Sequence, residues 1–130
     1  MKGLDKKLDD AWSLLGKVRA GFVCEVCGCG PSKCRLNTHH IVGRRNRNLR
    51  WELRNSVCLC VGHHKFYNQS AHEDSPWFNE RLQKYRKKDY DYVNSIKNNI
   101  RKWIPSEKEE LLDTFKKMIK EYEEGNSYFS

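Results

Sequence analysis

Residues 58–65 read CLCVGHHK, and this stretch decides how the chain folds. Cys58 and Cys60 alternate within the short run SVCLC, so in a strand both side chains point to one face. Cys60 and His63 then have two residues between them, a spacing that allows both to bind one metal ion. His64 follows at the start of an expected helix. The stretch predicts a strand, a metal-binding turn and a helix in immediate succession.

A second pair of metal ligands lies upstream, where residues 24–27 read CEVC. Cys24 and Cys27 have the same spacing as Cys60 and His63, and the four side chains together would complete a tetrahedral zinc site. Two such pairs far apart in the sequence favour a structural Zn²⁺. The ion would join the ends of a segment that is too polar to be stabilised by burial alone.

Three further cysteines remain, namely Cys29, Cys34 and Cys58. Cys29 can substitute for either cysteine of the first pair, and Cys34 can substitute for Cys60. We favour the other interpretation, in which all three are ordinary buried or spare thiols, because free cysteine commonly packs as a small hydrophobic residue.

Between the two pairs, residues 36–46 read LNTHHIVGRRN, with His39 and His40 side by side. Adjacent strand residues face opposite ways, but a twist at the end of a strand would allow both rings to reach one pocket. One imidazole would bind a divalent ion and the other, free of metal, would act as a general base. His64 would supply a second ligand, and Asn68, four residues further along the same helical face, a third.

The charge of the chain favours a polyanionic partner. Its 130 residues include 25 Lys and Arg against 17 Asp and Glu, a formal net charge of +8, and phosphates attract such a surface. Arg44, Arg45 and Arg47 follow the two histidines and are the expected nucleic-acid-binding residues. Arg50 and Arg54 are weaker candidates, and a merely solvated arginine loop is the alternative. Trp51 is expected to pack rather than to stack on a base.

The chain has the length of one small α+β domain in three segments. Residues 1–19 form an N-terminal helix, residues 20–72 hold every cysteine and histidine, and residues 73–130 form a helical C-terminal extension. No apolar run approaches the roughly 20 residues of a membrane span. We therefore expect a soluble cytoplasmic protein with no membrane partner.

Local patterns indicate where the helices of the extension begin. Ser75 is expected to cap the first, and Ser106 with Glu109 forms a capping box for the last. A stripe from Val93 to Ile104 is expected to be one helix face. The lysine-rich backs of these helices are either solvated or in contact with DNA.

From about residue 22 to residue 72 the chain resembles the HNH endonucleases, which share a ββα-metal (His-Me finger) fold. Their signature is a doublet ending in His, then Asn, then His on the following helix, here His39 with His40, Asn55 and His64. The resemblance implies that His40 activates water, that His39 and His64 hold the catalytic ion, and that Asn55 orients the loop and the base. The flanking cysteine pairs resemble a zinc-stapled subgroup.

The resemblance also implies a catalytic Mg²⁺ or Mn²⁺. Many members carry Asp where His39 stands, and the more nitrogen-rich site here brings Zn²⁺ or Ni²⁺ into consideration. The position four residues after the helix histidine is often His or Asn in the family, which again indicates Asn68 as a ligand.

More narrowly, residues 38–69 resemble the phage NinG/Rap-type recombination nucleases. That resemblance implies nicking of DNA, including branched intermediates, in a phage-infected or bacterial cell. A single site cuts one strand, so cleavage of both would require a homodimer or two successive nicks. Two alternatives stay open: a zinc-knuckle nucleic-acid-binding protein without catalysis, and RNA as the substrate.

Overall fold

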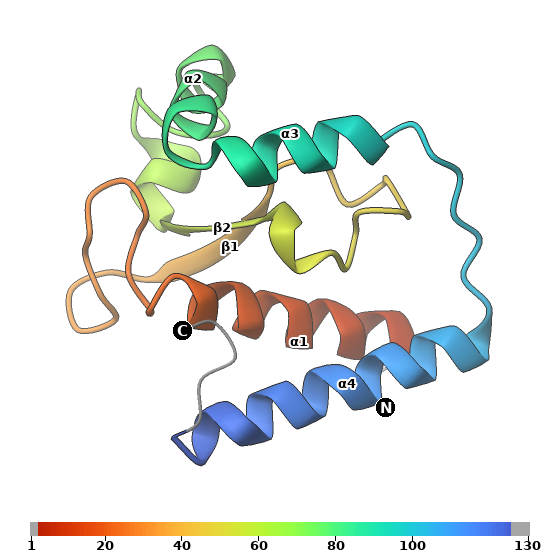
Figure 1. Cartoon of the computed structure of the whole chain (residues 1–130). Helices are drawn as coiled ribbons and strands as arrows, with labels where there is room; N and C mark the ends of the chain where they lie inside the picture. Colours follow the sequence, from red (N-terminus) through yellow and green to blue (C-terminus); the bar gives the residue numbers. More distant parts are fainter. Residues whose placement is uncertain (1–2, 126–130) are drawn as a thin grey trace.

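The computed structural model describes residues 3–125 of the chain. It contains a two-stranded sheet and helices, which confirms the predicted α+β class (Figure 1). In chain order the elements are α1 (Leu4–Arg19), β1 (Leu36–His40), the 3₁₀ turn η1 (Leu53–Asn55), β2 (Ser56–Cys60), the π-helical turn η2 (Gly62–Phe66), α2 (Ser75–Tyr85), α3 (Lys87–Ile96) and α4 (Pro105–Glu123).

The two strands are antiparallel, and their register sets which side chains share a face. Leu36 lies opposite Cys60, Thr38 opposite Cys58, and the pairing ends at His40. Every residue of β2 is buried, as expected of a strand that is covered on both sides. Directly opposed residues lie on the same face of an antiparallel sheet, so alternate residues of β1 face two different layers.

Helix α1 covers one face of the sheet, and α4 lies alongside α1 on its far side (Figure 1). Gly16 allows the close approach, because a Cβ there would lie 2.5 Å from Cγ2 of Thr38. A buried cluster joins the two helices through residues such as Leu8, Leu15 and Phe115. Burial of such side chains stabilises the pair by roughly 2 kcal/mol each.

Helix α2 and the loop that carries Cys24 and Cys27 cover the opposite face of the sheet. Phe78 and Leu82 of α2 pack in one buried cluster with Val57 and Leu59 of β2. Asp74 caps α2 by accepting a hydrogen bond from the backbone N–H of Trp77 at 3.1 Å. The prediction that Ser75 is the cap is therefore wrong by one residue, since Ser75 is already the first helical residue.

The C-terminal extension differs from the prediction between α3 and α4. Residues 97–104 are not helical, and Ile100 is 90% exposed, so the stripe from Val93 to Ile104 is not one helix face. Ile104 is extended because it precedes Pro105. Its backbone N–H donates to the Glu107 carboxylate at 3.1 Å. The predicted capping box at Ser106 and Glu109 is therefore wrong by two residues.

Among residues 3–125, no helix combines the length and the apolar character that crossing a membrane requires.

Candidate metal centres

The structure brings together the four predicted zinc ligands, Cys24, Cys27, Cys60 and His63. One ligand atom from each lies within 4.8 Å of the others. The sulfur atoms of Cys27 and Cys60 are 3.9 Å apart, and Nδ1 of His63 is 3.2 Å from the sulfur of Cys60. Three sulfurs and one imidazole nitrogen are a typical donor set for tetrahedral Zn²⁺. This cluster can hold a metal ion such as zinc.

Local backbone geometry prepares the cluster for a metal. The segment from Cys24 to Cys27 ends in a turn at Gly28, whose φ of 78° favours glycine. The Gly28 N–H donates to the carbonyl of Cys24. The N–H of Val26 points to the sulfur of Cys24 at 3.4 Å. Burial opposes ionisation of the Cys24 thiol, but hydrogen bonds from the backbone N–H groups of Cys27, Cys60 and Val26 outweigh burial and lower its pKa. A thiolate is the form that binds zinc.

The remaining cysteines do not join this cluster. Cys29 and Cys34 form a disulfide with Cα atoms 6.2 Å apart. The prediction that both are spare thiols is therefore wrong, and so is the alternative that they replace zinc ligands. Cys58 is a free, buried thiol as predicted, and burial raises its pKa to about 11.

A second cluster consists of three histidines. Nδ1 of His39 lies 3.1 Å from Nε2 of His64, and Nε2 of His64 lies 3.2 Å from Nε2 of His72. Burial lowers the pKa of His39 to about 3 and that of His64 to about 4, and the neighbouring histidines add to both shifts. The rings are therefore neutral at neutral pH, as metal binding requires. Three converging imidazole nitrogens fit a divalent transition-metal ion.

The third member of this cluster differs from the prediction. The turn η2 ends at Phe66, and Tyr67 is extended, so Asn68 does not share a helical face with His64. His72 reaches the cluster through the following loop, where its N–H donates to the His64 carbonyl at 3.2 Å. Sequence reasoning missed His72 because loop residues follow no period. The only indication in the sequence was that His72 was the one histidine with no predicted role as a metal ligand or base.

His40 lies on the other face of β1. Its ring stacks on Trp12, with centroids 3.8 Å apart and 10° between the planes, whereas His39 packs against Phe78. The expectation that a twist brings both rings into one pocket is therefore wrong. Nε2 of His40 lies 2.9 Å from the backbone carbonyl of Arg50. A carbonyl only accepts, so Nε2 carries the proton and Nδ1 keeps its lone pair.

Asn55 holds the loop that follows β1. It is completely buried, and its Nδ2 donates to the carbonyls of Val42 at 2.8 Å and Leu49 at 3.0 Å. Its Oδ1 accepts from the N–H of Val42 at 2.8 Å. One amide thus ties together both ends of the loop that carries the arginines and the Arg50 carbonyl.

The arginines near this loop divide into two groups. Arg50 pairs with Asp9 at 2.7 Å and Arg54 with Asp89 at 2.8 Å, so both serve the fold. Arg44, Arg45 and Arg47 are exposed, and within residues 3–125 none of them forms an ion pair.

Trp51 is 5% exposed, which confirms that it packs. Burial is the main cause of the lowered pKa of His40, and the nearby Arg44 adds to it.

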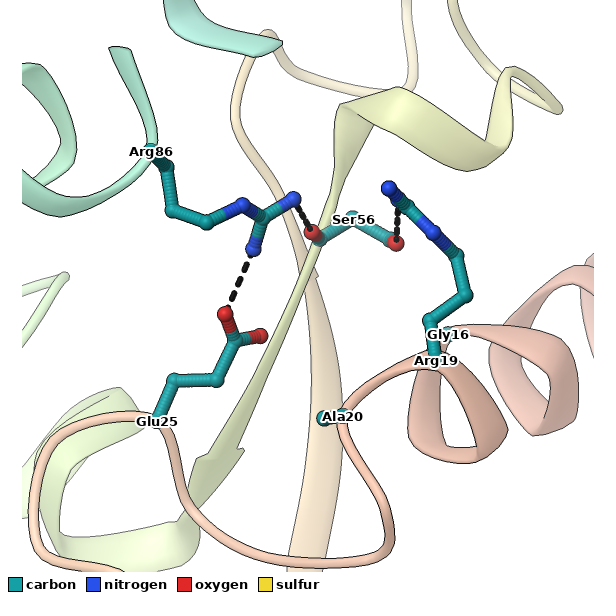
Figure 2. Close-up of a pocket in the computed structure, with 6 residues that line it drawn as sticks. All are labelled: Gly16, Arg19, Ala20, Glu25, Ser56 and Arg86. Carbon is teal, nitrogen blue, oxygen red and sulfur yellow. Dashed lines mark hydrogen bonds and ion pairs between the residues drawn. The ribbon is translucent and has the colours of Figure 1, made fainter. Parts of the chain in front are cut away.

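A cavity of about 160 Å³ lies between α1, β2 and the start of α3 (Figure 2). Arg19 and Arg86 approach Ser56 from opposite sides of the strand. Arg86 donates to Glu25 at 2.6 Å, to the Ser56 carbonyl at 3.0 Å and to Asp89 at 2.8 Å. These bonds attach α3 to the sheet, so we interpret the polar side chains that line the cavity as stabilising the fold rather than as binding a ligand.

Comparisons of the chain with protein-family models, with curated proteins and with solved structures find no match.

Proposed function

We propose that this protein is a metal-dependent endonuclease of the HNH type, which hydrolyses phosphodiester bonds in DNA. The observation that carries the proposal is the pair of neighbours at the end of β1. His39 belongs to a cluster of three imidazole nitrogens that could hold a metal ion, whereas His40 is held by the Arg50 carbonyl with one nitrogen free to accept a proton. A protein that only binds nucleic acid has no use for a metal-free imidazole held in this way.

His39, His64 and His72 would hold the catalytic ion. Bound there, a divalent ion would stabilise negative charge on the scissile phosphate and on the leaving oxygen. The donors are all nitrogen, and such a set favours Mn²⁺, Zn²⁺ or Ni²⁺ over Mg²⁺, which prefers oxygen ligands. The separate cysteine-rich cluster would hold a structural Zn²⁺.

The chain's own residues supply the proton transfer and the grip on the substrate. Nδ1 of His40 accepts a proton from water as the water oxygen attacks phosphorus in line. The bond from phosphorus to the 3′ oxygen breaks, and that oxygen takes a proton from solvent. His39 and His40 lie on opposite faces of β1, so the proposal requires a phosphodiester that lies across the end of the strand, where the pairing stops at His40. Arg44, Arg45 and Arg47 would hold neighbouring phosphates.

The test is the conversion of supercoiled plasmid to open circle by the full-length protein loaded with zinc. Mn²⁺, Mg²⁺, Ni²⁺ and added Zn²⁺ are compared, each with and without EDTA. We expect metal-dependent nicking, with products that carry 5′-phosphate and 3′-hydroxyl ends. Branched DNA, single-stranded DNA and RNA are tested in parallel. Absence of cleavage of every substrate with every metal would refute the proposal and favour a non-catalytic nucleic-acid-binding protein.

A further inference from the structure

Trp12 of α1 lies directly beneath the ring of His40. The two rings are nearly parallel, at 10°, and their centroids are 3.8 Å apart. The indole is 2% exposed, so it is fixed by the packing between α1 and α4. Its Nε1 donates to the carbonyl of Glu52 at 2.8 Å. One side chain therefore supports both the imidazole and the loop to which the imidazole is bound.

A second residue of α1 holds the same loop. Asp9 precedes Trp12 by three positions, so the two side chains lie on one face of the helix. Its Oδ1 accepts from Nε of Arg50 at 2.9 Å and from Nε1 of Trp51 at 2.8 Å, and its Oδ2 accepts from Nη2 of Arg50 at 2.7 Å. The carbonyl that binds His40 belongs to Arg50.

We infer that Trp12 is a positioning residue for His40, which makes the N-terminal helix part of the catalytic unit. The inference rests on the proposed nuclease function. The flat indole limits the imidazole to one plane, and Asp9, which holds the Arg50 side chain, keeps the Arg50 carbonyl within reach of Nε2. Together they fix the tautomer and point Nδ1 away from the loop. Without the indole, the ring can rotate and exchange its two nitrogens.

Variants of Trp12 distinguish the contribution of its flat ring from that of its indole N–H. Trp12→Phe keeps an aromatic ring under His40 but loses the bond to Glu52, whereas Trp12→Leu and Trp12→Met remove the flat ring. Zinc content and near-ultraviolet circular dichroism identify the variants that fold. Misplaced catalytic groups can cost about 100-fold. We expect the Leu and Met variants to lower kcat for nicking by about 30-fold with KM within about twofold, and Trp12→Phe to retain kcat within about threefold.

Trp103 provides a matched control. Its Nε1 donates to a carbonyl of the same loop, that of Arg47, at 2.9 Å, and its ring packs against Trp51 and contacts no histidine among residues 3–125. Trp103→Phe thus removes the same kind of bond without disturbing the ring beneath His40. We expect its kcat to stay within about twofold of the wild-type value, since only the stack on His40 orients a reacting group.

A second readout does not depend on cleavage. Nitrogen-15 NMR of the zinc-loaded, histidine-labelled full chain reports which imidazole nitrogen of His40 carries the proton. We expect a single Nε2–H tautomer in the wild type and in Trp12→Phe, and a mixture of tautomers in Trp12→Leu or Trp12→Met. A wild-type mixture or an Nδ1–H tautomer would overturn the inference, as would wild-type kcat in the Leu or Met variant. If the wild type cuts nothing, the proposed function fails and the tautomers alone decide the role of Trp12.

Discussion

Nδ1 of His39 and Nε2 of His64 lie 3.1 Å apart, although 25 positions separate the two residues. The antiparallel pairing places His39 opposite Val57 of β2, and the turn η2, which begins at Gly62, folds back so that His64 reaches His39. The same turn carries His63 into the cysteine cluster. Consecutive histidines of one short turn thus face two different candidate metal centres.

Loss of His72 should weaken metal binding at the histidine cluster. With the cysteine site first filled with Zn²⁺, Co²⁺ titrated into His72→Ala should bind about 100-fold more weakly than in the wild type, because one of three ligands is gone. Visible absorption of Co²⁺ measures the affinity. Asn68→Ala is the matched control, since both positions are exposed and only His72 lies within reach of His64. Equal weakening in the two variants would contradict this assignment.

We expect the cluster of Cys24, Cys27, Cys60 and His63 to hold a structural Zn²⁺ whose removal unfolds the chain. Zinc binding supplies about 10 kcal/mol in comparable small sites, as much as a whole domain's stability. Cys60→Ala should therefore bind no zinc at this site and show no cooperative thermal transition. Cys58→Ala is the control, because Cys58 is buried two residues away but outside the cluster. Cys58→Ala should retain zinc and a cooperative transition. A folded, zinc-free Cys60→Ala protein would disprove a stabilising metal.

Local spacing was enough to predict part of this arrangement. Cys24 and Cys27 belong to a short motif, and so do Cys60 and His63, so each pair was predictable from its own spacing. The two motifs meet because the segment before β1 folds back onto β2, where the Glu25 N–H donates to the Cys58 carbonyl at 2.8 Å. The prediction that Asn68 is a metal ligand is wrong, because it extends a helical period past Phe66, where the turn ends. The turn is π-helical, with the Tyr67 N–H donating to Gly62 at 2.8 Å, and no sequence period indicates that geometry.

Other features depended on contacts between distant segments. His72 follows His64 by eight positions in a loop, so its place depends on how that loop folds back. Nothing in the spacing linked Trp12 with His40, because the contact requires α1 to lie across the sheet. Ile100 kept helical spacing in the sequence but is exposed, because residues 97–104 are not helical; Trp103 packs against the buried cluster between α1 and α4.

Substitution of Asn55 should destabilise the fold. Asn55→Ala leaves the partly buried backbone groups of Val42 and the buried carbonyl of Leu49 without their hydrogen bonds, which we expect to cost about 3 kcal/mol. Asn48 is the matched control, because it is partly buried in the same region and, within the described part of the chain, its Nδ2 donates to the carbonyl of Ile96 alone. Asn48→Ala should cost about 1 kcal/mol. Urea unfolding measures both values, and equal losses would show that Asn55 does not organise the loop.

The contribution of Asp89 to stability should depend on pH. Burial opposes its ionisation, but hydrogen bonds from Arg54 and Arg86 outweigh burial and hold its pKa below 3.8. A group with a lowered folded-state pKa stabilises the fold above its unfolded pKa, and that stability is lost as pH falls through the folded value. Asp89→Asn should therefore cost about 2 kcal/mol at pH 7, and the difference from the wild type should shrink below pH 3.8.

Chemical unfolding of both proteins at a series of pH values checks this prediction. Asp91→Asn is the control, because Asp91 lies on the same helix and, among residues 3–125, forms its ion pair with the exposed Lys87 alone. Its effect should stay below about 1 kcal/mol, as for other exposed ion pairs. A difference between wild type and Asp89→Asn that is unchanged down to pH 2 would contradict the prediction.

We propose that the adjacent histidines have separate roles, in which His39 binds the metal ion and His40 accepts a proton from water. Plasmid nicking and Co²⁺ affinity, measured side by side for His39→Ala and His40→Ala, test this claim most directly. We predict that His39→Ala loses both, whereas His40→Ala binds Co²⁺ within about threefold of the wild type and nicks at least about 100-fold more slowly. Wild-type nicking by His40→Ala, or loss of Co²⁺ binding in that variant, would contradict the account.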